Sequence, residues 1–277
     1  MFQRHTIQAL RMWKNNPLHK PLIIRGARQV GKTTLVKIFA TEFDTFLHLD
    51  LERAEERELF EKNDTAEDVL TAIYLHKKQG KRTGKALLFI DEIQCSPKAV
   101  ALLRYFYEDL PELYVIAAGS LLESLIDTHI SFPVERVEYM ALRPCSFAEF
   151  LDAMGETQIL QALQSISLPA AIHGSMMKLF NQYVLVGGMP EAVASYAQTK
   201  DVVRLNTIYE TLLNGYRDDA EKYAPNATLQ KALLLELSYP STSVEFPLVA
   251  DLRKAPKLLW LDTELVGYVA GLQKELF

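Results

Sequence analysis

The sequence predicts an α/β fold, in which helices cover both faces of a parallel β-sheet and a helical region follows. Two observations predict it. Over the first 145 residues, short apolar runs alternate with longer segments of helical periodicity, which is the pattern of parallel sheets. After Arg143-Pro144 the alternation stops, and residues 146–240 are mostly helical in period. We therefore expect a sheet-containing core followed by a helical subdomain.

The hydrophobic pattern predicts the elements of the core in chain order. Pro17 and Gly80 are among the residues that break the periodic segments. The first, third and fourth of the strands are predicted from apolar runs, the second and fifth are strand candidates, and the helices are predicted from apolar residues that recur every three to four positions. The predicted strands are 21–25, 45–51, 86–90, 113–118 and 134–142, and the predicted helical segments are 6–14, 34–40, 52–80 and 97–109.

Composition limits the classes of function. The 277 residues are 49% hydrophobic and 23% charged, as in ordinary soluble proteins. The net charge of −5 argues against broad electrostatic binding of nucleic acid. The two cysteines, Cys95 and Cys145, match no metal-site spacing and suit a reducing compartment. No apolar run approaches the length of about 18 residues that spans a membrane, and the first residues lack the apolar stretch of a signal peptide. We therefore expect a cytoplasmic protein with no membrane segment.

A glycine-rich loop follows the first predicted strand. Residues 26–33 read GARQVGKT, which matches G-x-x-x-x-G-K-[ST], the P-loop (Walker A) pattern. The glycines let the backbone wrap around a phosphate, the lysine reaches the outer phosphates, and the hydroxyl holds Mg²⁺. The strand before the loop and the helix after it are the context that this motif requires. We therefore predict that a nucleotide is bound by Gly26, Ala27, Arg28, Gln29, Val30, Gly31, Lys32, Thr33 and Thr34.

An acidic pair ends the third predicted strand. The run Leu87–Ile90 is followed by Asp91-Glu92, which reads as a Walker B strand. Because parallel strands end at one edge of the sheet, Asp91 is expected to face the Mg²⁺ held by Thr33. Glu92 is then placed to act as a general base on the attacking water.

Three further side chains are candidates with open alternatives. Ser120 ends the fourth predicted strand, where it is placed either to hydrogen-bond the γ-phosphate or the water, or to cap a helix in an S-x-x-E box with Glu123. Arg136 and Arg143 flank the fifth predicted strand. Either arginine could neutralise charge on the transferred phosphoryl group, within its own chain or toward a neighbouring subunit. Arg136 is the favoured candidate.

Several segments together resemble one family. The chain is similar to the prokaryotic AAA+-like P-loop ATPases that carry a C-terminal domain of unknown function with a nuclease-like appearance. The matching segments are 21–35, 87–94, 119–120, 136–150, 183–191 and 216–223. The resemblance implies binding of ATP and Mg²⁺, an invariant-looking arginine at Arg136, and a helical lid around Gly187-Gly188.

The chain departs from the family pattern at three places. Glu135 stands where the family typically has glycine, so a positive φ there would strain it. The connection after Tyr216–Tyr223 is shortened, and the sequence ends at Phe277, where family members continue into the nuclease-like domain. We therefore expect a P-loop core over 1–145, a helical lid over 146–225 and a shortened remnant of the C-terminal region over 226–277.

The leading functional hypothesis is a Mg²⁺-dependent ATPase that acts as a conformational switch. Its expected catalytic residues are Lys32, Glu92, Arg136 and Ser120, with Thr33 and Asp91 as ligands of the metal. Self-association or a protein partner is expected beside ATP. One alternative is a nucleotide-binding interaction module with little or no turnover. A nucleic-acid-responsive ATPase is a third hypothesis, against which the acidic pI of about 5.8 weighs.

Overall fold

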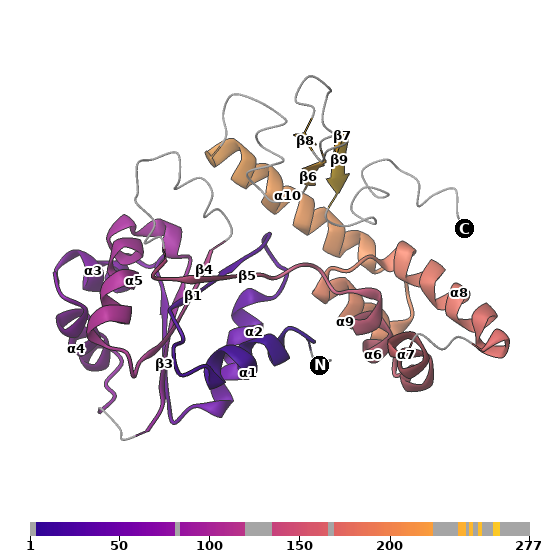
Figure 1. Cartoon of the computed structure of the whole chain (residues 1–277). Coiled ribbons are helices and arrows are strands. Elements are labelled where there is room, and N and C mark those ends of the chain that lie inside the picture. The colour runs from indigo at the N-terminus through magenta and orange to yellow at the C-terminus, as the bar shows by residue number, and fades with distance from the viewer. Residues whose placement is uncertain are drawn as a thin grey trace. The chain divides into compact units, whose positions relative to one another are not determined.

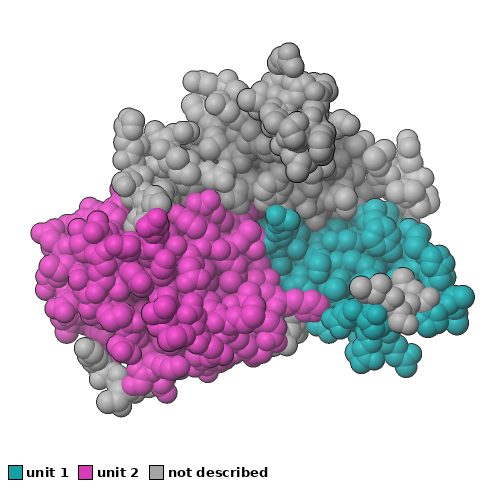
Figure 2. Space-filling model, in the orientation of Figure 1, with its two compact units in different colours: residues 1–4, 28–30, 143–277 teal, residues 5–27, 31–142 magenta. Residues whose placement is uncertain are grey.

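The fold is described from a computed structural model of the chain. The structure describes residues 4–80, 84–119, 135–165, 169–223, 238–241, 244–245, 249–250 and 257–260. The chain forms two compact units, coloured separately in Figure 2. We call residues 5–27 and 31–142 the sheet unit, and residues 1–4, 28–30 and 143–277 the helical unit.

The sheet unit alternates strands and helices, as the apolar runs predict. Its elements, labelled in Figure 1, are α1 (Ile7–Asn15), β1 (Leu22–Arg25), α2 (Lys32–Phe39), the short 3₁₀ helix Ala40–Glu42, β2 (Thr45–Asp50), α3 (Ala54–Glu61), α4 (Ala66–His76), β3 (Ala86–Asp91), the 3₁₀ helix Ile93–Cys95, α5 (Pro97–Asp109), β4 (Tyr114–Gly119) and β5 (Glu138–Ala141). Helix α5 begins where the sequence predicts it, with Pro97 in the first turn and the Ser96 side chain accepting a hydrogen bond from the Ala99 N–H.

The five strands form one parallel sheet, in the order β2-β3-β4-β1-β5. The predicted parallel sheet is therefore confirmed. Strand β4 lies between β1 and β3, so the loops that follow β1 and β3 are separated by one strand at the same edge. Ligands of α/β proteins bind outside this carboxyl edge.

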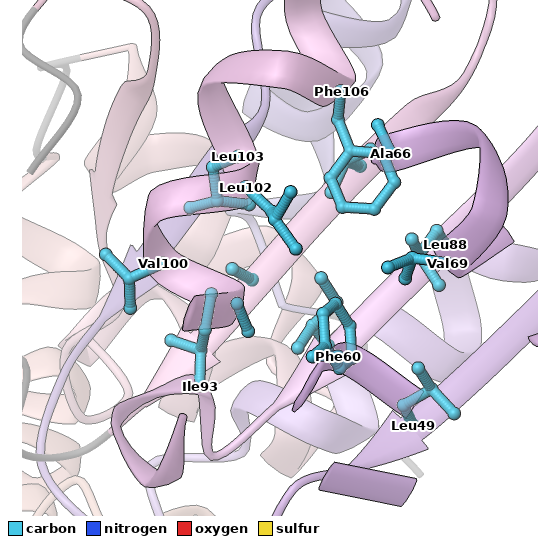
Figure 3. Packing of buried hydrophobic residues seen from close by; sticks show 14 of the residues in the cluster. Leu49, Phe60, Ala66, Val69, Leu88, Ile93, Val100, Leu102, Leu103 and Phe106 are labelled. Atoms are coloured by element: carbon cyan, nitrogen blue, oxygen red, sulfur yellow. The ribbon is translucent and has the colours of Figure 1, made fainter. Parts of the chain in front are cut away.

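Helices cover both faces of the sheet (Figure 1). On one face, side chains of α3, α4 and α5 pack against β2 and β3 in a continuous apolar core (Figure 3). Phe60, Phe106 and Leu88 are among its fully buried members. On the other face, α1 and α2 bury Trp13 and Phe39 among their apolar residues. Burial on both faces explains why β1, β3 and β4 read as continuous apolar runs, whereas burial alternates along the edge strands β2 and β5.

The helical unit begins after β5. Its helices are α6 (Phe147–Met154), α7 (Thr157–Gln164), α8 (Ala170–Val186), α9 (Pro190–Thr199) and α10 (Leu205–Tyr223), followed by the short strands β6 (Ser238–Ser241), β7 (Val244–Glu245), β8 (Val249–Ala250) and β9 (Lys257–Trp260). The strands β6 and β9 pair antiparallel, as do β7 and β8. Most of the predicted remnant over 226–277 lies outside the described residues. Among those that are described, no helix is long and apolar enough to cross a bilayer.

A capping box starts α6, and the backbone of Gly188 packs closely against Cys145, the residue that precedes the box. The Ser146 side chain accepts a hydrogen bond from the Glu149 N–H, while the Glu149 carboxylate accepts one from the Ser146 N–H. Between α8 and α9, the Gly188 carbonyl accepts a 2.6 Å hydrogen bond from the Cys145 N–H. A Cβ atom at Gly188 would lie 2.5 Å from the Cys145 carbonyl oxygen. This position therefore requires glycine because the two backbones touch.

Candidate nucleotide-binding site

The loop after β1 has the curved backbone that its two glycines were expected to allow. Gly26 and Gly31 have φ values of +151° and +91°, which L side chains rarely adopt. Gln29, between them, also has a positive φ of +62°. Gly31 is the N-cap of α2, so the loop ends at a helix N-terminus, where unpaired N–H groups and the helix dipole attract anions.

The side chains of the loop divide into two groups. Ala27 and Val30 are buried, so only their backbones can face a ligand, whereas Gln29 and Thr34 are exposed. Lys32 is only 6% exposed, and its Nζ donates hydrogen bonds to the carbonyls of Gly26 (2.6 Å) and Ala27 (2.9 Å). The lysine therefore lies across the loop, where its charge favours a bound phosphate.

Thr33 and Asp91, the predicted Mg²⁺ ligands, are brought together. The Thr33 hydroxyl donates a 2.6 Å hydrogen bond to Oδ2 of Asp91, which is 7% exposed at the end of β3. The two oxygens suit Mg²⁺, a hard cation that binds one or two protein oxygens and keeps several waters. The residues present therefore fit a magnesium ion beside the loop.

Glu92 is held in an uncommon backbone conformation. Its φ and ψ are +50° and +46°, in the left-handed region. Its N–H donates to Oδ1 of Asp91 at 3.2 Å, and one carboxylate oxygen accepts a hydrogen bond from the Gln94 side-chain amide. The Oε1 atom of Gln94 is buried with no hydrogen-bond partner among the described residues. The predicted general base is therefore tied to a neighbouring amide that the sequence did not single out as functional.

His48 was also missed. It lies on β2 next to β3, with its ring stacked 5.0 Å from that of Phe89. Its Nε2 atom is 3.8 Å from Oδ2 of Asp91 and is buried without a hydrogen-bond partner in the described part of the chain. The only sequence signal was a polar residue near the carboxyl end of a predicted strand.

Arg136, for which roles within its own chain and toward a neighbouring subunit were both left open, lies far from the phosphate loop of its own chain. Pairing of β1 with β5 puts Glu138 opposite Leu22, so Arg136 lies at the amino edge of the sheet. Six residues of strand separate that level from Gly26, which is about 20 Å. Arg136 instead donates to Oε1 of Glu108 at 2.9 Å.

The pair that Arg136 forms is exposed. Hydrogen bonds from Arg136 and then Arg104 hold the pKa of Glu108 below its usual value. Glu135, beside Arg136, has a φ of +67°. The family typically has glycine at this position, and a positive φ strains a residue that has a side chain. A role for Arg136 toward a neighbouring subunit stays a prediction.

Arg143, the other candidate, follows β5 at the carboxyl edge of the sheet, the edge at which the P-loop lies. It follows Leu142, whose N–H donates a 2.7 Å hydrogen bond to the carbonyl of Arg25, the residue before the loop. Ser120 lies outside the described residues, so both of its predicted roles stay predictions.

A family model matches most of the sheet unit. Residues 18–151 match the AAA domain, and residues 177–244 match a domain of unknown function, DUF8612. A search of curated proteins found no match.

Solved structures are similar over most of the chain. The Walker-type ATPase PABY2304 of Pyrococcus abyssi aligns with a TM-score of 0.58 and 14% identity, over 98% of this chain and 96% of that one. The STAND protein PH0952 of Pyrococcus horikoshii, with a tetratricopeptide repeat sensor, aligns with a TM-score of 0.41 and 13% identity, over 95% of this chain and 42% of that one. The first likeness is close enough to show a shared fold. Residues 18–151 therefore match an AAA domain, and the chain has the fold of an AAA+-like P-loop NTPase.

Proposed function

We propose that the chain binds ATP with Mg²⁺ and hydrolyses it as a conformational switch. One observation carries the proposal: the 2.6 Å hydrogen bond from the Thr33 hydroxyl to the Asp91 carboxylate. It joins the loop suited to phosphate with the acidic end of β3, and these two elements must be adjacent for a metal to contact both. The family and the fold support the same activity.

Each residue of the site has a distinct proposed role. Lys32 and the backbone N–H groups of the loop bind the β- and γ-phosphates, while Thr33 and Asp91 hold the metal. When bound, Mg²⁺ neutralises charge on the phosphate oxygens. Glu92 orients the attacking water and accepts its proton. Arg143, at the same edge of the sheet, supplies the positive charge that the sequence analysis preferred to assign to Arg136.

A second function is a nucleotide-binding module with little turnover. The hydrogen bond between Glu92 and Gln94 favours it, because a carboxylate that is already bonded is a weaker base toward water. Binding of nucleotide is common to both functions. The two differ in whether Glu92 accelerates the release of phosphate.

Phosphate release by wild type and Glu92→Gln tests the proposal. The substitution keeps the size of the side chain and removes its basicity. We expect the release to fall by about 100-fold or more, the usual contribution of a general base, while the Kd for ADP stays within about twofold. Equal background release from both proteins, with ADP still bound, would support the low-turnover module instead. Absence of ADP binding by wild type would contradict both functions.

A further inference from the structure

The three central residues of the P-loop, Arg28–Val30, belong to the helical unit. Two of their carbonyl groups accept hydrogen bonds from side chains of that unit. The Tyr216 hydroxyl donates to the Arg28 carbonyl at 3.0 Å, and Nη1 of Arg4 donates to the Val30 carbonyl at 2.8 Å. Neither donor belongs to the P-loop motif itself.

Arg4 is fixed by further contacts. It is 8% exposed, its Nε donates to Oε1 of Glu149 at 2.9 Å, and its Nη2 donates to the Arg143 carbonyl at 2.6 Å. Glu149 is itself held by the capping box that starts α6. The planar guanidinium therefore has little freedom to leave the Val30 carbonyl.

Tyr216 is equally fixed. It lies on α10 and is 4% exposed, so its ring is held by packing. A buried tyrosine hydroxyl needs a hydrogen-bond partner. Here that partner is a backbone carbonyl of the loop, about 190 residues earlier in the sequence.

Because peptide groups are planar, these two hydrogen bonds also fix the directions of the N–H groups that follow the two carbonyls. In a trans peptide, the carbonyl of one residue and the N–H of the next point in opposite directions. A carbonyl of Arg28 that is bonded to Tyr216 turns the Gln29 N–H away from Tyr216. In the same way, a carbonyl of Val30 that is bonded to Arg4 turns the Gly31 N–H away from Arg4.

We propose that Tyr216 and Arg4 are positioning residues, which hold the N–H groups of Gln29 and Gly31 toward the phosphates of the nucleotide. The inference rests on the proposed function. Backbone N–H groups of one loop that face inward together form an anion-binding concavity, and a loop fixed in this form loses less conformational freedom when phosphate binds. The positive φ of Gln29, unfavourable for a residue with a side chain, persists between these two anchored carbonyls.

Two tyrosines of α10 offer a matched test. Tyr209 is fully buried on the same helix, and its hydroxyl donates to the Val186 carbonyl, outside the loop. Tyr216→Phe and Tyr209→Phe each remove one buried hydroxyl. We expect Tyr216→Phe to weaken the binding of ADP by about three- to tenfold, the effect of one hydrogen bond. We expect Tyr209→Phe to change the Kd by less than about twofold.

Two further measurements separate positioning from general loss of structure. Inorganic pyrophosphate, which has no base or sugar, should lose affinity for Tyr216→Phe by the same factor as ADP. In hydrolysis, the KM for ATP should rise while kcat stays within about twofold, as when binding common to ground and transition states is lost. The melting temperatures of the two tyrosine variants show whether they lost similar stability.

Arg4→Lys is the second variant. It keeps the positive charge beside Glu149, but an ammonium cannot supply the fixed fork of donors. We expect it also to weaken ADP and pyrophosphate in parallel. If both tyrosine variants and Arg4→Lys bind ADP as wild type does, the positioning role is overturned while the proposed function stands. If wild type binds neither ADP nor pyrophosphate, the proposed function fails and this inference fails with it.

Discussion

Two turns of the chain differ in why particular glycines are required, namely Gly26 and Gly31 within residues 26–31, and Gly188 within residues 187–188. In the first, Gly26 and Gly31 supply the positive φ values that let the backbone curve as a phosphate-binding loop requires. In the second, Gly188 leaves no space, because its backbone touches that of Cys145. Substitutions near the first turn should therefore alter binding, and substitutions in the second should alter stability.

The largest expected effect separates binding from stability at the first turn. Lys32→Ala removes a charged donor from the loop, and we expect the Kd for ADP to rise by about 100-fold, as for the loss of charge-assisted hydrogen bonds. Lys37→Ala, at an exposed position of the same helix, is the control and should leave the Kd unchanged. Isothermal titration calorimetry measures both. An unchanged Kd for Lys32→Ala would remove the phosphate role from the loop.

The second turn should respond in the opposite way. Gly188→Ala forces a Cβ against the Cys145 backbone, and we expect the free energy of unfolding to fall by about 1–3 kcal/mol. The Kd for ADP should stay within about twofold. Gly174→Ala is the control, because a Cβ there meets no atom within 4 Å. In a helix interior this change should raise stability by up to about 1 kcal/mol. Denaturant unfolding that gives the same sign for both would contradict the packing argument.

A smaller effect concerns the metal. Thr33→Val keeps the shape of the side chain and removes the hydroxyl that contacts Asp91. We expect the Kd for ADP without Mg²⁺ to change little, and the gain in affinity on adding Mg²⁺ to shrink by about tenfold, roughly one lost interaction with a charged group. Titrations of ADP with and without Mg²⁺ measure this gain. An unchanged gain would mean that Thr33 does not hold the metal.

The smallest expected effect is at Arg136. Because it lies at the far edge of the sheet, Arg136→Gln should leave the Kd for ADP and the specific activity of dilute protein unchanged. Arg143→Gln should lower the specific activity by at least about tenfold, since an arginine beside the transferred phosphoryl group contributes strongly to its rate. If activity rises with protein concentration in wild type but not in Arg136→Gln, Arg136 acts toward a neighbouring subunit.

The sheet and the loop could be predicted because their signals are local. Continuous apolar runs, the glycine spacing and the acidic pair after Ile90 each lie within a few residues of one another. The edge at which Arg136 lies depends on which strand pairs with β1 and in which register, and no pattern near Arg136 records that pairing. His48 and Gln94 are similar cases, since what singles them out is their distance from Asp91 and Glu92.

At Glu135, the resemblance to a family predicted a backbone feature that the sequence pattern alone could not. Composition and periodicity say nothing about φ at this residue. Comparison with the glycine of the family raised the possibility of a positive value, and the structure has one. Less of the helical unit could be predicted from the sequence. Its helices follow from periodicity, but the buried contacts of Arg4 could not be predicted, because they join residues more than 100 positions apart.

The position of Arg4 has a consequence for synthesis of the chain. Arg4 leaves the ribosome 145 residues before Glu149, with which it forms an ion pair. At about 5–20 residues per second, Arg4 waits roughly 7–30 s for that partner. The strands and helices between them can fold in that interval, since secondary structure forms in microseconds. The contact that anchors the Val30 carbonyl through Arg4 is therefore completed only after the whole sheet has been synthesised.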